Sequence, residues 1–168
     1  MLGRPIGGTN VLAFSRDDRL VATGDGDAVV RTYDANTGKP IAENHELLMV
    51  PLALDFTADG KSVVAGGGDR MLLFIDAATG TTTRRMDRTA QPAALLEMSP
   101  DGSALATAFM KAENMTQPEH ILVYDTGSGR ALVDWLPPQL PAGGGWTHEG
   151  HLLVAIAAPD ALHLWRLR

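Results

Sequence analysis

The sequence repeats itself at intervals of 42 residues, and this repeat restricts the fold more than any other feature of the chain. In each copy, an apolar run ends at a large residue and is followed by a polar turn that contains aspartate. The large residues are Phe14, Phe56 and Met98, which are spaced 42 and again 42 residues apart. A chain with this period is built from similar structural units that follow one another.

A second marker keeps the same step. An aspartate follows Tyr33, Ile75 and Tyr124, and in each case threonine or serine stands three residues after the aspartate and glycine stands four residues after it. The first spacing is 42 residues and the second is 49, and the surplus of seven falls in the polar stretch 111–119. A fourth unit begins near residue 146 and reaches Trp165, 41 residues after Tyr124. Two independent markers with one period predict four units.

Each unit consists of short apolar runs separated by turn residues. In the first unit the runs are 11–14, 20–23, 29–33 and 40–42, and the breaks contain Asp, Asn and Gly. Runs of four or five residues bounded in this way are typical of antiparallel strands joined by hairpins. The first three strands of a unit are apolar and should be buried, whereas the fourth is polar and should face water. No helical period is sustained, so the sequence predicts an all-β protein.

The repeat resembles that of the WD-repeat (WD40) family. Residues 99–107 look like the family's hairpin between the first and second strands, and Tyr33-Asp34 stands where the family has Trp-Asp. The resemblance implies a β-propeller of four WD40-type blades of four-stranded antiparallel sheets, the last blade being incomplete at the C-terminus. The blades would occupy approximately residues 10–45, 51–88, 92–136 and 144–168, with residues 1–7 as a possible closing strand.

The resemblance also assigns a structural role to two aspartates. The family often carries an aspartate six residues before the Trp position, bonded in the tight turn ahead of the third strand. Asp27 and Asp69 match this position, whereas the third and fourth units have Pro118 and Pro159 there. We therefore expect Asp27 and Asp69 to be structural turn residues and the first two blades to be the more regular ones.

A shared fold does not define a function, so the function has to be sought where the period breaks. Two segments break it: 111–119 and 136–145. By the resemblance, both emerge on one rim of the propeller, and loops on a rigid scaffold are where binding usually occurs. We expect a non-enzymatic protein–protein interaction scaffold, without cofactor, whose candidate partner-binding residues are Lys111, Glu113, Asn114, Met115, Gln117, Glu119, Leu136, Pro138, Gln139, Leu140 and Trp146.

The alternative is a propeller enzyme or small-ligand sensor with its site at the central channel. The quinoprotein propellers carry an Asp-x-x-Thr-Gly element, which residues 34–38 and 76–80 satisfy, but their docking tryptophan is absent from both units. The five histidines lack zinc-ligand spacing, and Asp25-Gly26-Asp27 lacks the further ligands of a calcium loop. No catalytic or metal-binding set emerges, and turn aspartates bonded to backbone amides are the simpler explanation.

The charge and hydropathy of the chain restrict the kinds of partner and the compartment that we expect. The formal charge is −6 and no cluster of Lys and Arg occurs, which disfavours nucleic acid. No apolar run is long enough to span a bilayer, no signal peptide begins the chain, and we expect a cytoplasmic protein. An open row of four blades would expose apolar faces, so we expect either self-association or the remainder of a larger propeller.

Overall fold

All regular structure that can be described in this chain is β-strand. The computed structural model describes residues 7–68, 70–87, 93–110, 118–138, 141–158 and 161–167. Within these residues it contains fifteen strands and no helix. The expectation of an all-β protein is therefore confirmed.

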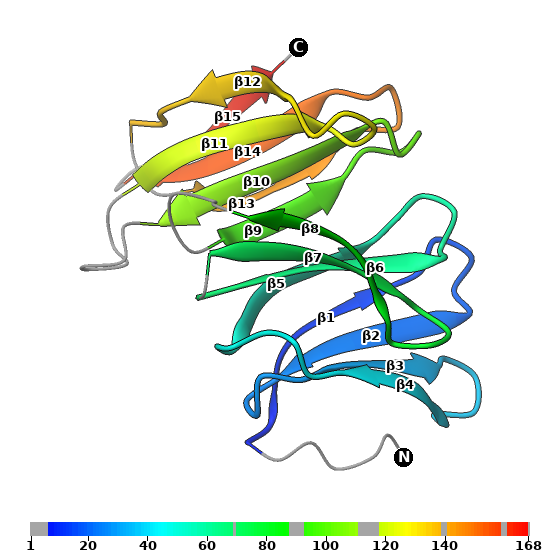
Figure 1. Ribbon diagram of the computed structural model, residues 1–168. Coiled ribbons are helices and arrows are strands. Elements are labelled where there is room, and N and C mark those ends of the chain that lie inside the picture. Colours follow the sequence, from blue (N-terminus) through cyan, green and yellow to red (C-terminus); the bar gives the residue numbers. More distant parts are fainter. Residues whose placement is uncertain are drawn as a thin grey trace.

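The strands form four antiparallel sheets, each made of strands that are consecutive in the chain (Figure 1). Three sheets have four strands and the last has three. The first sheet contains β1 (Thr9–Phe14), β2 (Leu20–Asp25), β3 (Val30–Asp34) and β4 (Pro40–Asn44). The second contains β5 (Pro51–Phe56), β6 (Ser62–Gly67), β7 (Met71–Asp76) and β8 (Thr82–Asp87). The third contains β9 (Ala93–Met98), β10 (Ala104–Met110), β11 (Pro118–Asp125) and β12 (Ala131–Trp135). The fourth contains β13 (Pro141–Trp146), β14 (Leu152–Ala158) and β15 (Ala161–Leu167).

The turn between the first two strands of a sheet is built in the same way three times. A hydroxyl donates to an aspartate two residues later, from Ser15 to Asp17, from Thr57 to Asp59 and from Ser99 to Asp101. The residue after each aspartate has a positive φ, which glycine adopts without strain. It is glycine in the second and third sheets and Asp18 in the first. These repeated aspartates therefore stabilise the turns by accepting hydrogen bonds within them.

The sheets are stacked face to face in chain order, and one apolar core lies between each pair of neighbours (Figure 1). The core between the first two sheets contains Ala22 and Phe56, the next contains Val64 and Met98, and the last contains Ala106 with Leu152. Because successive side chains of a strand point to opposite faces, the second and third sheets contribute to a core on each side. Their middle strands accordingly contain apolar runs such as 63–65, 72–75 and 104–106.

The first strand of the first sheet departs from the sequence expectation. The apolar strands were expected to be buried, but Leu12 and Phe14 of β1 are 57% and 55% exposed. Their counterparts 42 residues later, Leu54 and Phe56, are 5% and 1% exposed. The expectation was wrong for β1 because the first sheet has a neighbouring sheet on one side only, and Leu12 and Phe14 point to the other side.

The first strands of neighbouring sheets pack directly on one another, β1 on β5, β5 on β9 and β9 on β13. Arg16, in the turn after β1, reaches past the second sheet and donates to the backbone oxygens of Met98, Ser99 and Pro100 in the third. The first and third sheets therefore approach each other at their first strands. The sheets converge at β1, β5 and β9.

A close backbone contact fixes the spacing between the first two sheets. A Cβ at Gly80 would lie 2.2 Å from the backbone oxygen of Glu43, and the φ of Gly80 is +74°. The Asn44 side-chain amide donates to the Gly80 oxygen at 2.9 Å, while the Thr32 hydroxyl donates to the Ala77 oxygen at 2.8 Å. Glycine at position 80 is therefore required both for its conformation and for the approach of β4.

Candidate functional site

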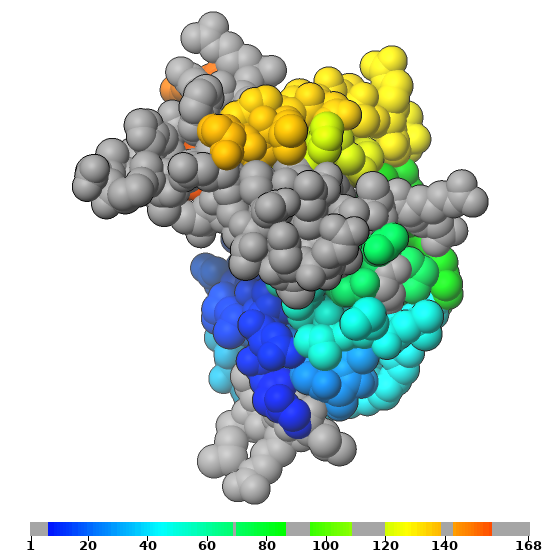
Figure 2. Space-filling model, turned by 90° about the vertical axis from the view of Figure 1, so that its left-hand side faces the viewer, coloured from blue at the N-terminus to red at the C-terminus, as the bar shows by residue number. Residues whose placement is uncertain are grey.

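The antiparallel order places all connections at one of two ends of the strands. We call the end with the β2–β3, β4–β5, β6–β7, β10–β11 and β12–β13 connections the loop end, and the opposite end the turn end. The two irregular segments of the sequence adjoin the loop end, since Met110 pairs with Pro118 and Ile121 pairs with Trp135 there. Figure 2 views this end, on which parts of the first, second and third sheets share one face.

Most of the predicted partner-binding residues cannot be located. Outside the described residues lie Lys111, Glu113, Asn114, Met115, Gln117, Gln139 and Leu140, and also the predicted turn residue Asp69. Glu119 belongs to β11, which begins at Pro118. Leu136 and Pro138 follow β12 at the loop end, and both are exposed. The two predicted binding loops therefore remain a prediction. The structure locates only Glu119, at the end of one segment, and Leu136 and Pro138, at the start of the other.

Three large apolar side chains are exposed at the loop end. Leu48 is 80% exposed and Met49 55% in the β4–β5 connection, and Leu136 is 56% exposed after β12. Met49 also packs against Gly68 of the β6–β7 turn, where a Cβ would lie 3.1 Å from its sulfur. Leu48 and Leu136 are therefore exposed on two separate connections at the same end of the strands.

Trp146 lies elsewhere. It ends β13 at the turn end, is partly buried, and packs against the core between the third and fourth sheets. Its indole N–H donates to the backbone oxygen of Glu97 at 3.0 Å. The structure therefore gives Trp146 contacts between sheets and separates it from Leu136 and Pro138.

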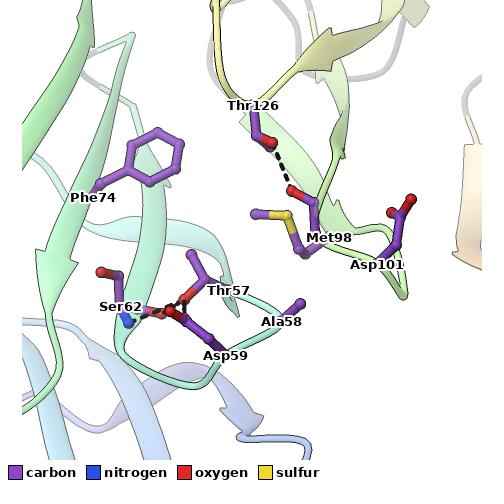
Figure 3. Close-up of a pocket in the computed structure, with 9 residues that line it drawn as sticks. Thr57, Ala58, Asp59, Ser62, Phe74, Met98, Asp101 and Thr126 are labelled. Carbon is purple, nitrogen blue, oxygen red and sulfur yellow. Dashed lines mark hydrogen bonds between the residues drawn. The ribbon is translucent and has the colours of Figure 1, made fainter.

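The turn end contains a pocket of about 400 Å³ between the second and third sheets. In Figure 3, Thr57, Asp59 and Ser62 lie on one side, and Met98, Asp101 and Thr126 lie on the other. The full lining is Thr57, Ala58, Asp59, Ser62, Phe74, Met98, Asp101, Gly102 and Thr126. The pocket was not anticipated from the sequence, because its walls are the repeated turns.

The polar groups of this pocket are already bonded within the turns. The Asp59 carboxylate accepts from the Thr57 hydroxyl and from the Lys61 amide. The Asp101 carboxylate accepts from hydroxyls and one amide, and these bonds lower its pKa to about 2. The Thr126 hydroxyl donates to the backbone oxygen of Gly102. The hydroxyls and carboxylates of Thr57, Asp59, Asp101 and Thr126 therefore all have hydrogen-bond partners among the turn residues.

A cluster of charged side chains lies on the outer face of the first sheet. The Arg31 guanidinium binds the carboxylates of Asp25 at 2.7 Å, Asp27 at 2.8 Å and Glu43 at 3.1 Å. Asp25 is fully buried and also accepts from the Thr9 and Thr23 hydroxyls. The guanidinium lowers the pKa of Asp27 and of Glu43, because it favours their charged forms.

This cluster includes Asp27, one of the two aspartates expected in the turns. Asp27 lies in the turn before β3, and its carboxylate is bonded chiefly to Arg31 and also to the Val29 amide. The sequence signal was a charged residue at 31, where the second sheet has Leu73 at the 42-residue equivalent. A charged residue in an apolar strand needs partners, and Asp25 and Asp27 are near in the chain.

Two carboxylates on the first strands of neighbouring sheets were not identified as notable residues from the sequence. Asp55 of β5 and Glu97 of β9 are 42 residues apart and interrupt strands that are otherwise apolar. Burial raises the pKa of Asp55, although its carboxylate accepts from the amides of Phe56 and Met98. Burial and the nearby Asp55 charge raise the pKa of Glu97 to about 7.

Glu97 should therefore make the stability of the fold depend on pH. Its carboxyl holds a proton more tightly in the folded chain than in the unfolded chain, where the pKa is near 4.5. Its favourable contribution is complete below pH 4.5 and is lost as the pH rises through about 7. We expect Glu97→Gln to unfold at higher denaturant concentration than the wild type at pH 8 and at about the same concentration at pH 4. The check is urea denaturation across this range, and an unchanged pH profile in the variant would contradict the assignment.

Other kinds of site find no support among the side chains that the structure describes. No three His, Asp or Glu side chains of the described residues gather so as to hold a metal ion. The described part of the chain contains no helix with the length and apolar character that a membrane crossing needs. Comparison of the sequence with protein-family models gives no match, and none of the curated proteins is significantly similar to it.

Proposed function

We propose that the four sheets are consecutive blades of a WD-type β-propeller and that this chain is a non-enzymatic scaffold which binds a protein partner at the loop end. The observation that supports the propeller arrangement best is the convergence of the sheets at their first strands. A stack that converges along one side curves around an axis, as propeller blades do.

The repeated cores agree with this arrangement. Every blade of a propeller presents equivalent positions to its neighbour, and here Phe56 and Met98 occupy equivalent positions in the first and second cores. Arg16 supports the same curvature, because its bonds to Met98 and Ser99 bridge sheets that are not adjacent. A flat stack would hold the first and third sheets apart.

The scaffold role is supported by how the polar side chains are used. The carboxylates that recur with the repeat, such as Asp34, Asp76 and Asp125, accept bonds from their own turns. At the loop end, by contrast, Leu48, Met49 and Leu136 are exposed. We infer that the partner is a protein with apolar side chains that contact these residues, since the burial of apolar surface is the main favourable contribution to most protein–protein association.

The loop end can be tested by single substitutions. We expect Leu48→Glu and Leu136→Glu each to weaken partner binding at least about tenfold, because a charge replaces an apolar anchor. The control is Leu132→Glu, which changes a leucine that is 50% exposed on β12, away from this end. Partner proteins are captured from the native host with the wild-type chain, and the affinity of each variant for the recovered partner is measured by calorimetry.

The possible outcomes distinguish the protein-binding scaffold from the propeller enzyme or ligand sensor. Loss with Leu48→Glu and Leu136→Glu but not with Leu132→Glu supports the scaffold. Equal binding by all three variants would overturn the loop end as the binding surface. Turnover, or tight binding of a small molecule by the purified chain, would instead support the propeller enzyme or ligand sensor.

A further inference from the structure

The outer face of the first sheet carries apolar residues at positions that are buried in the second and third sheets. Leu12 and Phe14 are more than half exposed. Their equivalents in the third sheet, Leu96 and Met98, are each 3% exposed and pack on the second sheet. The first sheet thus has the residues of a sheet-to-sheet contact without a neighbour to cover them.

The three apolar cores between the sheets are built from equivalent positions of the repeat. Phe56 of the second sheet shares a core with Ala22 of the first, and Met98 of the third shares one with Val64 of the second. In the same register, Trp146 packs with the core that contains Ala106. Phe14 belongs to the series of Phe56, Met98 and Trp146, so it should face a residue of the series of Ala22, Val64 and Ala106.

The fourth sheet carries the next member of that second series on its outer face. Leu152 pairs with Trp146 as Leu105 pairs with Met98, which aligns Leu153 with Ala106. Leu152 and Val154 point into the last core and are 1% and 0% exposed. Leu153, between them, points to the opposite face.

Leu153 and the next outward residue, Ala155, are covered less completely than their counterparts. Both are intermediate in burial. Ala106 and Ala108, at the equivalent positions of the third sheet, are 0% and 3% exposed because the fourth sheet covers them. One chain therefore carries both halves of the repeated contact, each of them unmatched.

We propose that the outer face of the first sheet packs on the outer face of the fourth sheet of a second copy of this chain, with Phe14 against Leu153. The smallest assembly that covers both faces is a closed pair of copies with two such contacts. The same face also carries the charged cluster, in which the Arg31 guanidinium is bonded to the carboxylates of Asp25, Asp27 and Glu43 and leaves a surplus of negative charge. Leu12 and Phe14 supply the apolar part.

The contact can be tested by cross-linking, because the chain contains no cysteine. We expect the single variants Phe14→Cys and Leu153→Cys, when mixed and mildly oxidised, to form a disulfide-linked pair. Neither variant alone should do so, since Phe14 does not face Phe14 in a head-to-tail contact. A mixture of Leu132→Cys and Leu153→Cys is the matched control and should stay unlinked.

The mass in solution gives a second readout that does not depend on cysteine chemistry. Light scattering should give twice the mass of one chain for the wild type and for Leu132→Glu, and the mass of one chain for Leu12→Glu. A wild-type chain that stays monomeric at high concentration would overturn the proposal and leave this face for another protein or another part of a longer chain. A pair without the Phe14-to-Leu153 cross-link would overturn it as well.

Discussion

Replacement of Phe56 by alanine is expected to lower the free energy of unfolding by about 3–5 kcal/mol, which is the usual cost of removing a buried aromatic ring. Phe56 is 1% exposed and lies in the core between the first and second sheets with Ala22, Val63 and Ile75. The cost arises because the transfer free energy of the ring is lost and a cavity is left in this core. Urea denaturation of the wild type and the variant measures the difference.

The repeat supplies the control for this experiment. Phe14 occupies the equivalent position 42 residues earlier and is 55% exposed. In dilute solution, Phe14→Ala should change the stability by no more than about 0.5 kcal/mol, as surface substitutions usually do. Equal losses for the two variants would contradict the stacking of the first two sheets as described.

A second large effect is expected from Arg31. Removal of one partner from a buried ion pair leaves the other charge uncompensated and costs about 3–5 kcal/mol. Arg31→Ala would deprive the fully buried Asp25 of its only cationic partner among the described residues. We expect a loss near the lower limit, about 3 kcal/mol, because the Thr9 and Thr23 hydroxyls would still donate to Asp25.

The matched substitution is Arg19→Ala, which removes the same side chain from an exposed pair. Arg19 and Asp17 are 3.6 Å apart and their side chains are 79% and 58% exposed. Such pairs contribute about 0–1 kcal/mol. Thermal denaturation of the two variants should therefore give clearly different midpoints. An Arg31→Ala variant as stable as Arg19→Ala would show that Asp25 is solvated in the folded chain.

The strands themselves were predictable because their signals are local. The runs 11–14, 20–23, 29–33 and 40–42 correspond to β1 to β4, with ends that differ by two residues or fewer. Hydroxyl and carboxylate side chains such as Ser99 and Asp101 specify their turn from within the turn itself. The antiparallel order and the three-stranded last sheet follow from the same pattern.

The chemistry between strands and between sheets was not predictable in the same way. That Arg31 would bind Asp25 depends on which face of β2 and β3 each side chain takes, and the repeat has leucine at the matching position 73. The interaction of Asp55 with Glu97 depends on the packing of β5 against β9. The exposure of Leu12 and Phe14 depends on which sheets have neighbours, and a period alone does not show where a stack has its ends.

The stacking order also determines how this chain opens. The second and third sheets are each held by a core on both faces, whereas the first and fourth sheets are held on one. Local unfolding of an end sheet breaks one such interface, but unfolding of the second sheet breaks two. Chains whose units contact mainly their neighbours behave as nearly one-dimensional systems, in which fluctuations begin at the ends and spread inward. In dilute solution, where copies of the chain are not paired, the backbone amides of β6, β7 and β10 should accordingly exchange their hydrogens with solvent more slowly than those of β1.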